Sequence, residues 1–380
     1  MNALQKLIDK ARDDGLEMMG IAPQTIPGRG VGVLAERDLD PGTVILAVPA
    51  QAVRSLHTVP KSITRKLDAS MSVHGLLAAD VALRRTAWTE WARLVPSWCE
   101  LETAMPLTWP QGLRDMLPAE AKRLVAQQHV KFKKDWEMYK KGFPNSEQQV
   151  YLYAWLLVNT RGFYYETPAL LRYPWHDRLA LIPIADLFNH AAVGCLVEYS
   201  PGGYQIVTDR AYQAGEELRT SYGEHSNDFL LAEYGFTLKD NNWDGLCLDE
   251  LVLSKLSSEH ISALRKKGYQ SDFMLHPGSV SQNNLWIALR LHCSGSGGPQ
   301  WQQYVDGNED AEGTLAKAKD MLAVLLREHL RQAEDTLIAL QSMEIDQDTQ
   351  RDTLAQRWGQ LVVMARQALD AQSLASKAIT

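Results

Sequence analysis

The order of apolar and polar positions divides the first half of the chain into a helix, strands and a longer helical stretch. Residues 1–19 predict an amphipathic helix with apolar side chains at helical spacing. Residues 31–56 predict β structure, and the turn Asp40-Pro41-Gly42 between two apolar runs predicts a hairpin, because proline presets φ and glycine accepts a positive φ. From residue 57 to about 150 the apolar spacing becomes helical. The pattern predicts a β-rich region that a helical segment interrupts.

The second half of the chain begins with further strands and continues as helices. Residues 179–222 return to short apolar runs separated by Gly and Pro. Residues 226–235 predict one short helix, which Ser226 or Asn227 can cap and which Gly235 can end. From residue 241 onward the pattern is mostly helical, with long apolar stripes. The chain is therefore expected to end in a helical module.

Composition and charge exclude several classes of protein. The chain has 39 Lys and Arg against 46 Asp and Glu, a formal net charge of −7. By its overall charge it is not a dedicated nucleic-acid binder, because counterion release needs surplus cations, although a local basic patch remains possible. No run approaches the roughly 20 apolar residues of a membrane helix, and the N-terminus lacks the apolar core of a signal peptide. We expect an intracellular protein, in the cytoplasm and/or the nucleus, with no membrane partner.

The four cysteines point to reduced thiols. They lie far apart, and no two stand at a Cys-x-x-Cys spacing. This pattern argues against a zinc site built from thiolates and against a disulfide framework. We therefore predict no metal site and an intracellular redox environment.

Three segments carry candidate chemistry. The first, Gly28-Arg29-Gly30-Val31-Gly32, does not complete a dinucleotide fingerprint, because Val33 stands where glycine is needed. Two interpretations of the segment stay open: a glycine-rich turn before a strand, and a loop where a ligand approaches the backbone closely.

The second candidate is a group of polar side chains after an apolar run, and the third is a pair of tyrosines. Asp186, Asn189 and His190 can converge on one ligand, although the local chemistry favours capping of the turn by Asp186 and Asn189 themselves. Tyr222 and Tyr234 flank the capped helix. Taken alone, each tyrosine is typical of a packed core aromatic whose hydroxyl is satisfied.

Taken together and in this order, the segments resemble the SET-domain methyltransferases, in the branch of the Rubisco large-subunit lysine methyltransferase. Residues 28–49 resemble the opening strands of that branch, and Asn159-Thr160-Arg161-Gly162-Phe163 resembles its Ser-Arg-x-Phe motif. Residues 181–190 resemble its Asp-x-x-Asn-His segment, and residues 222–236 its closing run of Tyr-Gly, Ser-Asn and Tyr-Gly-Phe. The resemblance covers about residues 20–240.

The resemblance implies an α+β fold, with a β-rich SET fold, a helical insert and an all-α C-terminal domain. The expected boundaries are an N-terminal helix at 1–19, a SET-like domain at 20–240 with its insert at about 57–150, and a substrate-binding-like helical domain at 241–380. The tryptophans of the insert are interpreted as its packing rather than as a cation-binding cage: Trp88, Trp91, Trp98 and Trp109.

The resemblance also implies a function. It predicts S-adenosylmethionine as cofactor and methyl transfer to a lysine side chain of a non-histone protein. The overall charge, independently of the resemblance, predicts no nucleic-acid partner. Tyr222 is the expected catalytic residue and also touches the cofactor. The other expected cofactor residues are Arg29, Gly30, Val31, Asn189 and His190. The expected substrate residues are Arg161, Asp186 and Tyr234. Three alternatives stay open: a histidine acceptor on the same fold, a non-catalytic protein-binding module, and a helical adaptor with a β insert.

Overall fold

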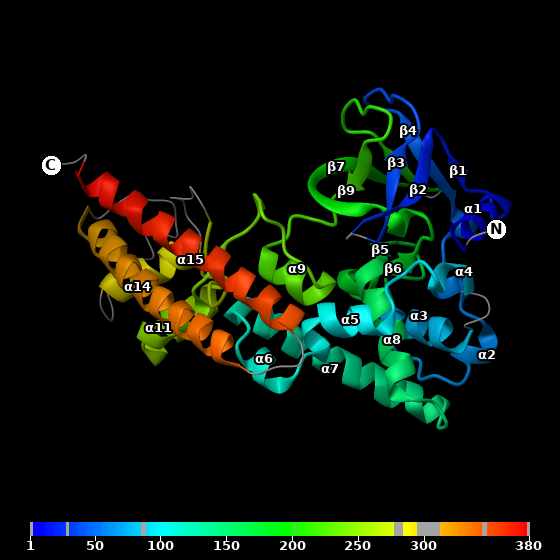
Figure 1. Cartoon of the computed structure of the whole chain (residues 1–380). Helices are drawn as coiled ribbons and strands as arrows, with labels where there is room; N and C mark the ends of the chain where they lie inside the picture. Colours follow the sequence, from blue (N-terminus) through cyan, green and yellow to red (C-terminus); the bar gives the residue numbers. More distant parts are fainter. Residues whose placement is uncertain are drawn as a thin grey trace. The chain divides into compact units, whose positions relative to one another are not determined.

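The structure, a computed structural model, describes residues 3–27, 30–84, 89–200, 202–276, 284–294, 312–343 and 348–377. The chain divides into two compact units (Figure 1). The first consists of Met1–Leu107 and Ala126–Glu224, and the second of Thr108–Val125 and His225–Thr380.

The first unit is built on a seven-stranded sheet with the order β1-β4-β8-β7-β9-β3-β2. All neighbouring strands are antiparallel except β7 and β9, which are parallel. A separate two-stranded sheet pairs β5 with β6. The strands are β1 (Glu17–Met18), β2 (Ile21–Ile26), β3 (Gly30–Ala35), β4 (Val44–Pro49), β5 (Gly162–Tyr164), β6 (Leu179–Leu181), β7 (Asn189–Ser200), β8 (Gly203–Val207) and β9 (Glu217–Thr220).

Helices interrupt the strands between β4 and β5, as the apolar spacing predicts. Strands are present on both sides of the turn at Asp40-Pro41-Gly42, where Gly42 has a φ of 77°. The predicted hairpin is wrong, however, because β3 pairs with β2 and β9, whereas β4 pairs with β1 and β8. In the interrupting region α3 packs against α8, and the two helices bury a fully enclosed Trp155. The helices up to β5 are α1 (Ala3–Asp13), α2 (Lys61–Thr64), α3 (Val73–Leu83), α4 (Thr89–Ala92), α5 (Trp98–Ala104), α6 (Gln111–Asp115), α7 (Ala119–Gly142) and α8 (Gln148–Arg161). Of these, α6 and the first residues of α7 belong to the second unit.

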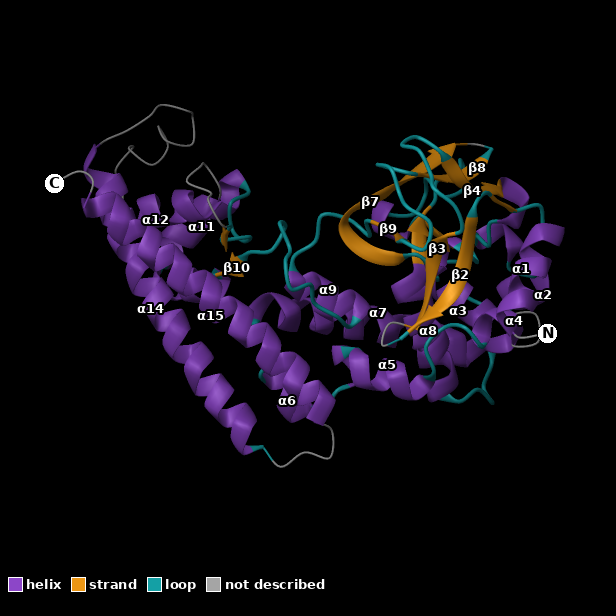
Figure 2. Ribbon diagram, turned by 45° about the horizontal axis from the view of Figure 1, so that its top comes forward, coloured by secondary structure: helices purple, strands orange, loops and turns teal. Residues whose placement is uncertain are grey.

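The second unit is mainly helical. Its long helices α14 and α15 pack side by side (Figure 2), and α12 packs against α14. The apolar stripe expected on α14 is confirmed, since Ala318, Leu322, Leu325, Leu326 and Ala333 are all buried. The elements are α9 (Asn227–Tyr234), β10 (Leu246–Cys247), α10 (Asp249–Lys255), α11 (Ser258–Lys267), β11 (Met274–Leu275), α12 (Asn284–Ser294), α14 (Glu312–Ser342) and α15 (Asp348–Lys377).

Helix α9 has the two ends that its sequence predicts. The Ser226 side chain caps the helix by accepting a hydrogen bond from the backbone N–H of Phe229, and Gly235 ends it with a φ of 80°. The Asp228 carboxylate pairs with the Nε–H of Arg357 at 2.8 Å, which ties α9 to α15 in the core of the second unit. None of the helices that the structure describes combines the length and the apolarity needed to cross a membrane.

Candidate active site

The parallel pair of β7 and β9 brings two distant segments together. Asn189 lies opposite Arg219 and His190 opposite Thr220. The register then shifts, because Cys195 also lies opposite Thr220, so β7 bulges between these two pairings. Figure 2 shows β7 as a long curved strand beside β9. The first residues of β7 therefore lie next to the chain that leaves β9 toward Tyr222.

Tyr222 is held at two points by this neighbouring segment. Its backbone N–H donates to His190 Nδ1 at 3.0 Å, and its hydroxyl donates to the carbonyl oxygen of Phe188 at 2.8 Å. The rings of His190 and Tyr222 lie 4.9 Å apart. Because His190 Nδ1 accepts a hydrogen bond, this nitrogen carries no proton in the arrangement. The structure thus brings Tyr222 and His190, two of the predicted site residues, into direct contact.

The Tyr222 phenol stays protonated at neutral pH. Burial raises the pKa of Tyr222 to about 12; the Arg161 guanidinium acts to lower this pKa, while the carboxylates of Asp186 and Glu217 raise it. The phenol can therefore donate and accept hydrogen bonds, but it is not a base at neutral pH. These electrostatic interactions also place Arg161 and Asp186 close to Tyr222.

Asn189 is fixed by a carboxylate from β9. Its Nδ2 donates to Glu217 Oε1 at 2.7 Å. A Cβ atom at Gly32 in β3 would lie only 2.9 Å from this Nδ2 and 2.4 Å from Ile26 Cδ1, so a side chain there would displace its neighbours. The sequence reasoning missed Glu217, whose only signal is a polar position in a short strand.

The glycine-rich segment that contains Gly30 and Val31 extends along the same edge. β3 runs antiparallel to β9, with Val33 opposite Leu218, so residues 30–32 extend toward the end of β9 that leads to Tyr222. Gly30 has a φ of 75°, and no described atom lies within 4 Å of the position where its Cβ would be. The Gly30 backbone is therefore accessible to a ligand. Arg29, predicted beside it, lies outside the described residues.

Asp186 and Arg161 form a second, buried part of the site. Arg161 Nη1 donates to the Asp186 backbone carbonyl at 2.7 Å and lies 3.3 Å from its Oδ2 atom. The Asp186 side chain is 2% exposed, and burial raises its pKa against the opposing effect of Arg161. Its Oδ1 atom and Arg161 Nε are buried without a hydrogen-bond partner in the described part of the chain. A buried pair with unused donor and acceptor atoms is suited to a polar ligand.

The turn before Asp186 has a strained backbone. Ile184 is fully buried and adopts a φ of 78°. This is the left-handed region, which a β-branched residue rarely enters. Strain of this kind persists where the surrounding structure enforces it, and it gathers at functional sites.

Trp91 is a site residue that the sequence reasoning interpreted only as packing. It comes from α4, and its indole Nε1–H donates to Asp186 Oδ2 at 2.7 Å. Trp91 is 2% exposed, so its packing role is also correct. The helical region between β4 and β5 therefore helps to hold the carboxylate of Asp186. Trp88 lies outside the described residues.

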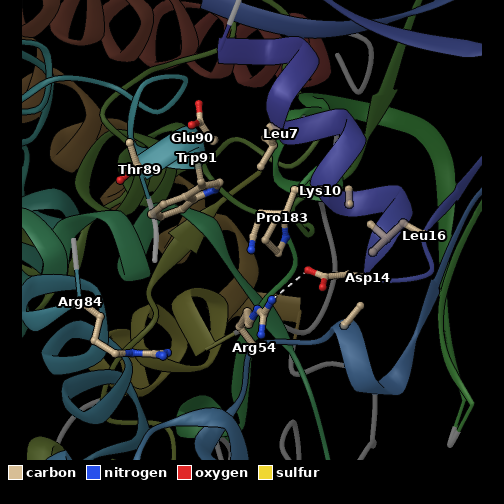
Figure 3. Close-up of a pocket in the computed structure, with 12 residues that line it drawn as sticks. Leu7, Lys10, Asp14, Leu16, Arg54, Arg84, Thr89, Glu90, Trp91 and Pro183 are labelled. Carbon is tan, nitrogen blue, oxygen red and sulfur yellow. Dashed lines mark hydrogen bonds and ion pairs between the residues drawn. The ribbon is translucent and has the colours of Figure 1, made fainter. Parts of the chain in front are cut away.

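Trp91 also lines a cavity of about 410 Å³ (Figure 3). Lys10 and Asp14 border this cavity, together with Pro183. On one wall Arg54 Nη2 lies 3.0 Å from Asp14 Oδ2. None of the predicted site residues that the structure describes lines the cavity, so it is distinct from the cluster around Tyr222.

Tyr234 lies in the second unit. It is the last residue of α9, and its ring lies 6.2 Å from Phe236 and 6.5 Å from Phe229. Within this unit it belongs to an aromatic group at the end of a capped helix. The contacts described above for the other site residues all lie within the first unit. The role of Tyr234 therefore stays a prediction.

Comparisons with known proteins identify related sequences. A family model described as the SET domain matches residues 30–223, about half of the chain. The ribosomal lysine N-methyltransferase set11 of Schizosaccharomyces pombe is 28% identical over 322 residues, which are 82% of this chain and 82% of the relative. The human SET domain-containing protein 4 is 26% identical over 305 residues, 72% of this chain and 68% of the relative.

Solved structures share the fold over nearly the whole chain. The structure of Rubisco LSMT bound to AdoMet has a TM-score of 0.63 and 16% identity, and the match covers 98% of this chain and 92% of that one. The SET domain of LSMT bound to lysine and AdoHcy has a TM-score of 0.64 and 15% identity, covering 98% of this chain and 91% of that one. These matches confirm the predicted α+β fold class with its helical C-terminal region. The chain belongs to the SET domain family.

Proposed function

We propose that this protein is an S-adenosylmethionine-dependent protein-lysine N-methyltransferase that acts on a non-histone protein. The observation that carries the proposal is the double anchoring of Tyr222, through its backbone to His190 and through its hydroxyl to Phe188. This arrangement fixes a neutral phenol beside the accessible backbone of Gly30 and the buried pair of Arg161 and Asp186. The relative from S. pombe is named for ribosomal lysine methylation, so a ribosomal protein is the first substrate class to test.

The residues of the site fit the proposed cofactor. S-adenosylmethionine carries an ammonium group, a carboxylate and an adenine ring, and when bound it supplies a methyl group on a positively charged sulfur. The unpartnered Asp186 Oδ1 offers an acceptor, and Arg161 Nε offers a donor. Asn189 and the open backbone at Gly30 add polar groups at the accessible edge. We assign the cofactor to Gly30, Val31, Asn189, His190 and Tyr222, with Arg29 as a further candidate.

The chain's own residues orient the acceptor rather than deprotonate it. A free lysine amine has a pKa near ~10.4, so it must lose a proton before it can attack. Desolvation and a neighbouring positive charge both favour the neutral amine. With its pKa near 12, Tyr222 stays neutral and orients the amine through its hydroxyl. Positioning of this kind is worth up to roughly 7–11 kcal/mol.

We further propose that the protein is intracellular, in the cytoplasm and/or the nucleus, and that its helical C-terminal part recruits the substrate protein. All four cysteines are free thiols, and such thiols persist in a reducing compartment. The proposed domain boundaries are those expected from the sequence: a SET-like domain over residues 20–240 and a substrate-binding domain over 241–380. If circular dichroism shows that a chain lacking 241–380 folds, the deletion should lower protein methylation more than cofactor binding, and equal loss of both in that folded chain would contradict a recruiting role.

The decisive experiment is methyl transfer from labelled S-adenosylmethionine to purified ribosomal subunits and to proteins of a cell extract. Wild type is compared with Tyr222→Phe, Asn189→Ala and the control Tyr151→Phe. Tyr151 is a fully buried tyrosine whose hydroxyl also donates to a backbone carbonyl, that of Gly75 at 3.2 Å. The control therefore loses the same type of bond outside the site.

The proposal predicts labelled protein that contains methyl-lysine with wild type and with Tyr151→Phe, and strongly reduced label with the other two variants. Methyl-histidine in the labelled protein would change the acceptor class. Cofactor binding without transfer to any protein would favour a non-catalytic binding module. Absence of cofactor binding would refute the proposal.

A further inference from the structure

Two helices of the first unit form a positively charged surface, although the chain as a whole is acidic. We call it the α2–α7 basic surface. It consists of seven exposed cations, three in and after α2 and four in α7. They are Lys61, Arg65, Lys66, Lys133, Lys134, Lys140 and Lys141.

Close packing joins the two helices at their ends. A Cβ atom at Gly142 would lie 2.5 Å from the carbonyl oxygen of Lys66, so only glycine allows this approach. The Lys66 Nζ atom lies 5.3 Å from the centre of the Phe143 ring. The end of α7 therefore lies against the segment after α2 (Figure 1), and their cations share one surface.

The lysines of α7 are arranged as two adjacent pairs. Residues seven apart lie on the same face of a helix, so the pair at 133 and 134 and the pair at 140 and 141 line up along about 12 Å. Lys140 is held in place, because its Nζ lies 5.5 Å from the Trp136 ring centre and donates to the carbonyl of Ser146 at 2.8 Å. Ordered cations lose less side-chain entropy when an anion binds.

Most of these cations have no anionic partner. Among the described residues, none of the seven takes part in an ion pair within 4.0 Å. The exposed acids of the same segments are Asp68 and Glu137. Asp68 accepts hydrogen bonds from the Ser70 N–H and hydroxyl, and the charge of Lys141 also acts on its carboxylate. Seven cations against two acids leave a local charge of about +5 in a chain whose net charge is −7. On the α7 face, Glu137 lies between the two lysine pairs, so four cations meet one exposed acid there.

We infer that the α2–α7 basic surface binds the phosphate backbone of RNA. Lysine is a compact point charge that pairs with phosphates without reading sequence, and release of condensed counterions supplies the driving force. The surface suits RNA better than a membrane, because Val130 is the one exposed large apolar side chain among the described residues of α2 and α7. Membrane-surface helices need an apolar face as well as cations.

The inference extends the proposed function and rests on it for its biological meaning. A methyltransferase with such a surface would meet its protein substrate as part of an RNA–protein particle. The lysine-bearing protein would occupy the Tyr222 site, and the RNA beside it would bind the α2–α7 basic surface. The expectation of no nucleic-acid partner came from net charge, which does not describe this local surface.

The test measures RNA binding by fluorescence polarisation with the full chain and no methyl donor. The probes are a labelled single-stranded RNA and an RNA hairpin, titrated between about 50 mM and 200 mM salt. The test variant is Lys133→Glu with Lys134→Glu. The matched control is Lys266→Glu with Lys267→Glu, an adjacent pair of exposed lysines on α11, which changes the net charge equally.

We expect wild type to lose RNA affinity with rising salt, with a slope of log K against log salt of roughly −3 for about four contacted phosphates on a single strand. The α7 variant should bind about tenfold or more weakly, and the α11 control within about twofold of wild type. A second α7 variant, Lys133→Gln with Lys134→Gln, should weaken binding less, and circular dichroism confirms that each variant folds.

Other results would overturn the inference. These are equal losses in the two charge-reversed pairs, no salt dependence, or tighter binding to polyglutamate or to equimolar phosphatidylserine–phosphatidylcholine vesicles than to RNA. A methyl-transfer assay distinguishes failure of this inference from failure of the proposed function. The α7 variant should methylate an RNA-free protein substrate normally and an RNA-bound particle poorly. RNA binding without methyl transfer to either substrate would refute the proposed function but would still support RNA binding by the α2–α7 basic surface.

Discussion

Tyr222→Phe removes one hydroxyl and leaves the rest of the anchoring intact. The backbone N–H of residue 222 still donates to His190, and the two rings keep their contact. The lost bond is the 2.8 Å donation to the carbonyl of Phe188, a residue that is 1% exposed. A buried carbonyl left unpaired costs about 1–3 kcal/mol of unfolding free energy. Domains are typically stable by about 5–15 kcal/mol, so the variant stays folded.

Because the folded fraction hardly changes, a loss of turnover reports the role of the hydroxyl itself. We expect kcat to fall about 100-fold, which corresponds to about 2.7 kcal/mol of transition-state stabilisation. The dissociation constant for S-adenosylmethionine should change by less than about threefold, because the remaining polar groups of the site are retained.

The assay combines single-turnover methyl transfer, cofactor titration and urea denaturation. Tyr151→Phe should lose about the same unfolding free energy, since its hydroxyl donates to Gly75 in the core, and should keep wild-type kcat. A Tyr222→Phe protein with kcat within about threefold of wild type would refute the reasoning. So would an equal fall in kcat for Tyr151→Phe, because activity would then follow stability.

Three further predictions concern buried polar groups. Trp91→Phe deletes the donor to Asp186 and should lower the unfolding free energy by about 1.5–3 kcal/mol in urea, and no measurable change would contradict the bond. Arg357→Met leaves the buried carboxylate of Asp228 without its cation and should cost about 3–5 kcal/mol, and a loss under 1 kcal/mol would refute this. Burial and Asp228 raise the pKa of Glu120 from 4.5 to about 7. Between these two pH values the folded state keeps a proton that the unfolded state releases. The contribution of Glu120 to the free energy of unfolding is therefore complete below about pH 4.5 and is lost as the pH rises through about 7. Glu120→Gln should remove this part of the pH dependence from urea midpoints, and a profile identical to wild type would contradict the assignment.

Local signals in the sequence are sufficient for many of the helices and strands, and the resemblance supplies part of the site. The ends of α9 follow from the capping chemistry of Ser226 and Gly235, which acts over a few residues. The resemblance to the SET motifs assigns residues 189, 190 and 222 to the site, whereas local chemistry alone favours turn capping and a packed aromatic, and the structure places the three residues together. Their roles in binding and catalysis remain predictions.

The pairing of the strands could not be predicted in the same way. Apolar alternation marks a strand without naming its partner, so the parallel pair of β7 and β9 and its bulge leave no sequence signal. Trp91 was missed for a similar reason. In a helical apolar pattern a tryptophan indicates packing, and its acceptor Asp186 lies 95 residues further along the chain. Long-range partners of this kind depend on tertiary structure.

The sheet order of the first unit has a consequence for synthesis of the protein. β3 must pair with β9, and Val33 lies opposite Leu218, so the hairpin of β2 and β3 waits for a strand made much later. At about 5–20 residues per second, translation delays that pairing by roughly 10–40 s. The packing of α3 against α8 joins residues that are all made before β9, so these helices can form during this interval. On the ribosome, the helical part of the unit can therefore be folded while the hairpin still exposes an unpaired edge, and the Tyr222 site assembles only after β9 has emerged.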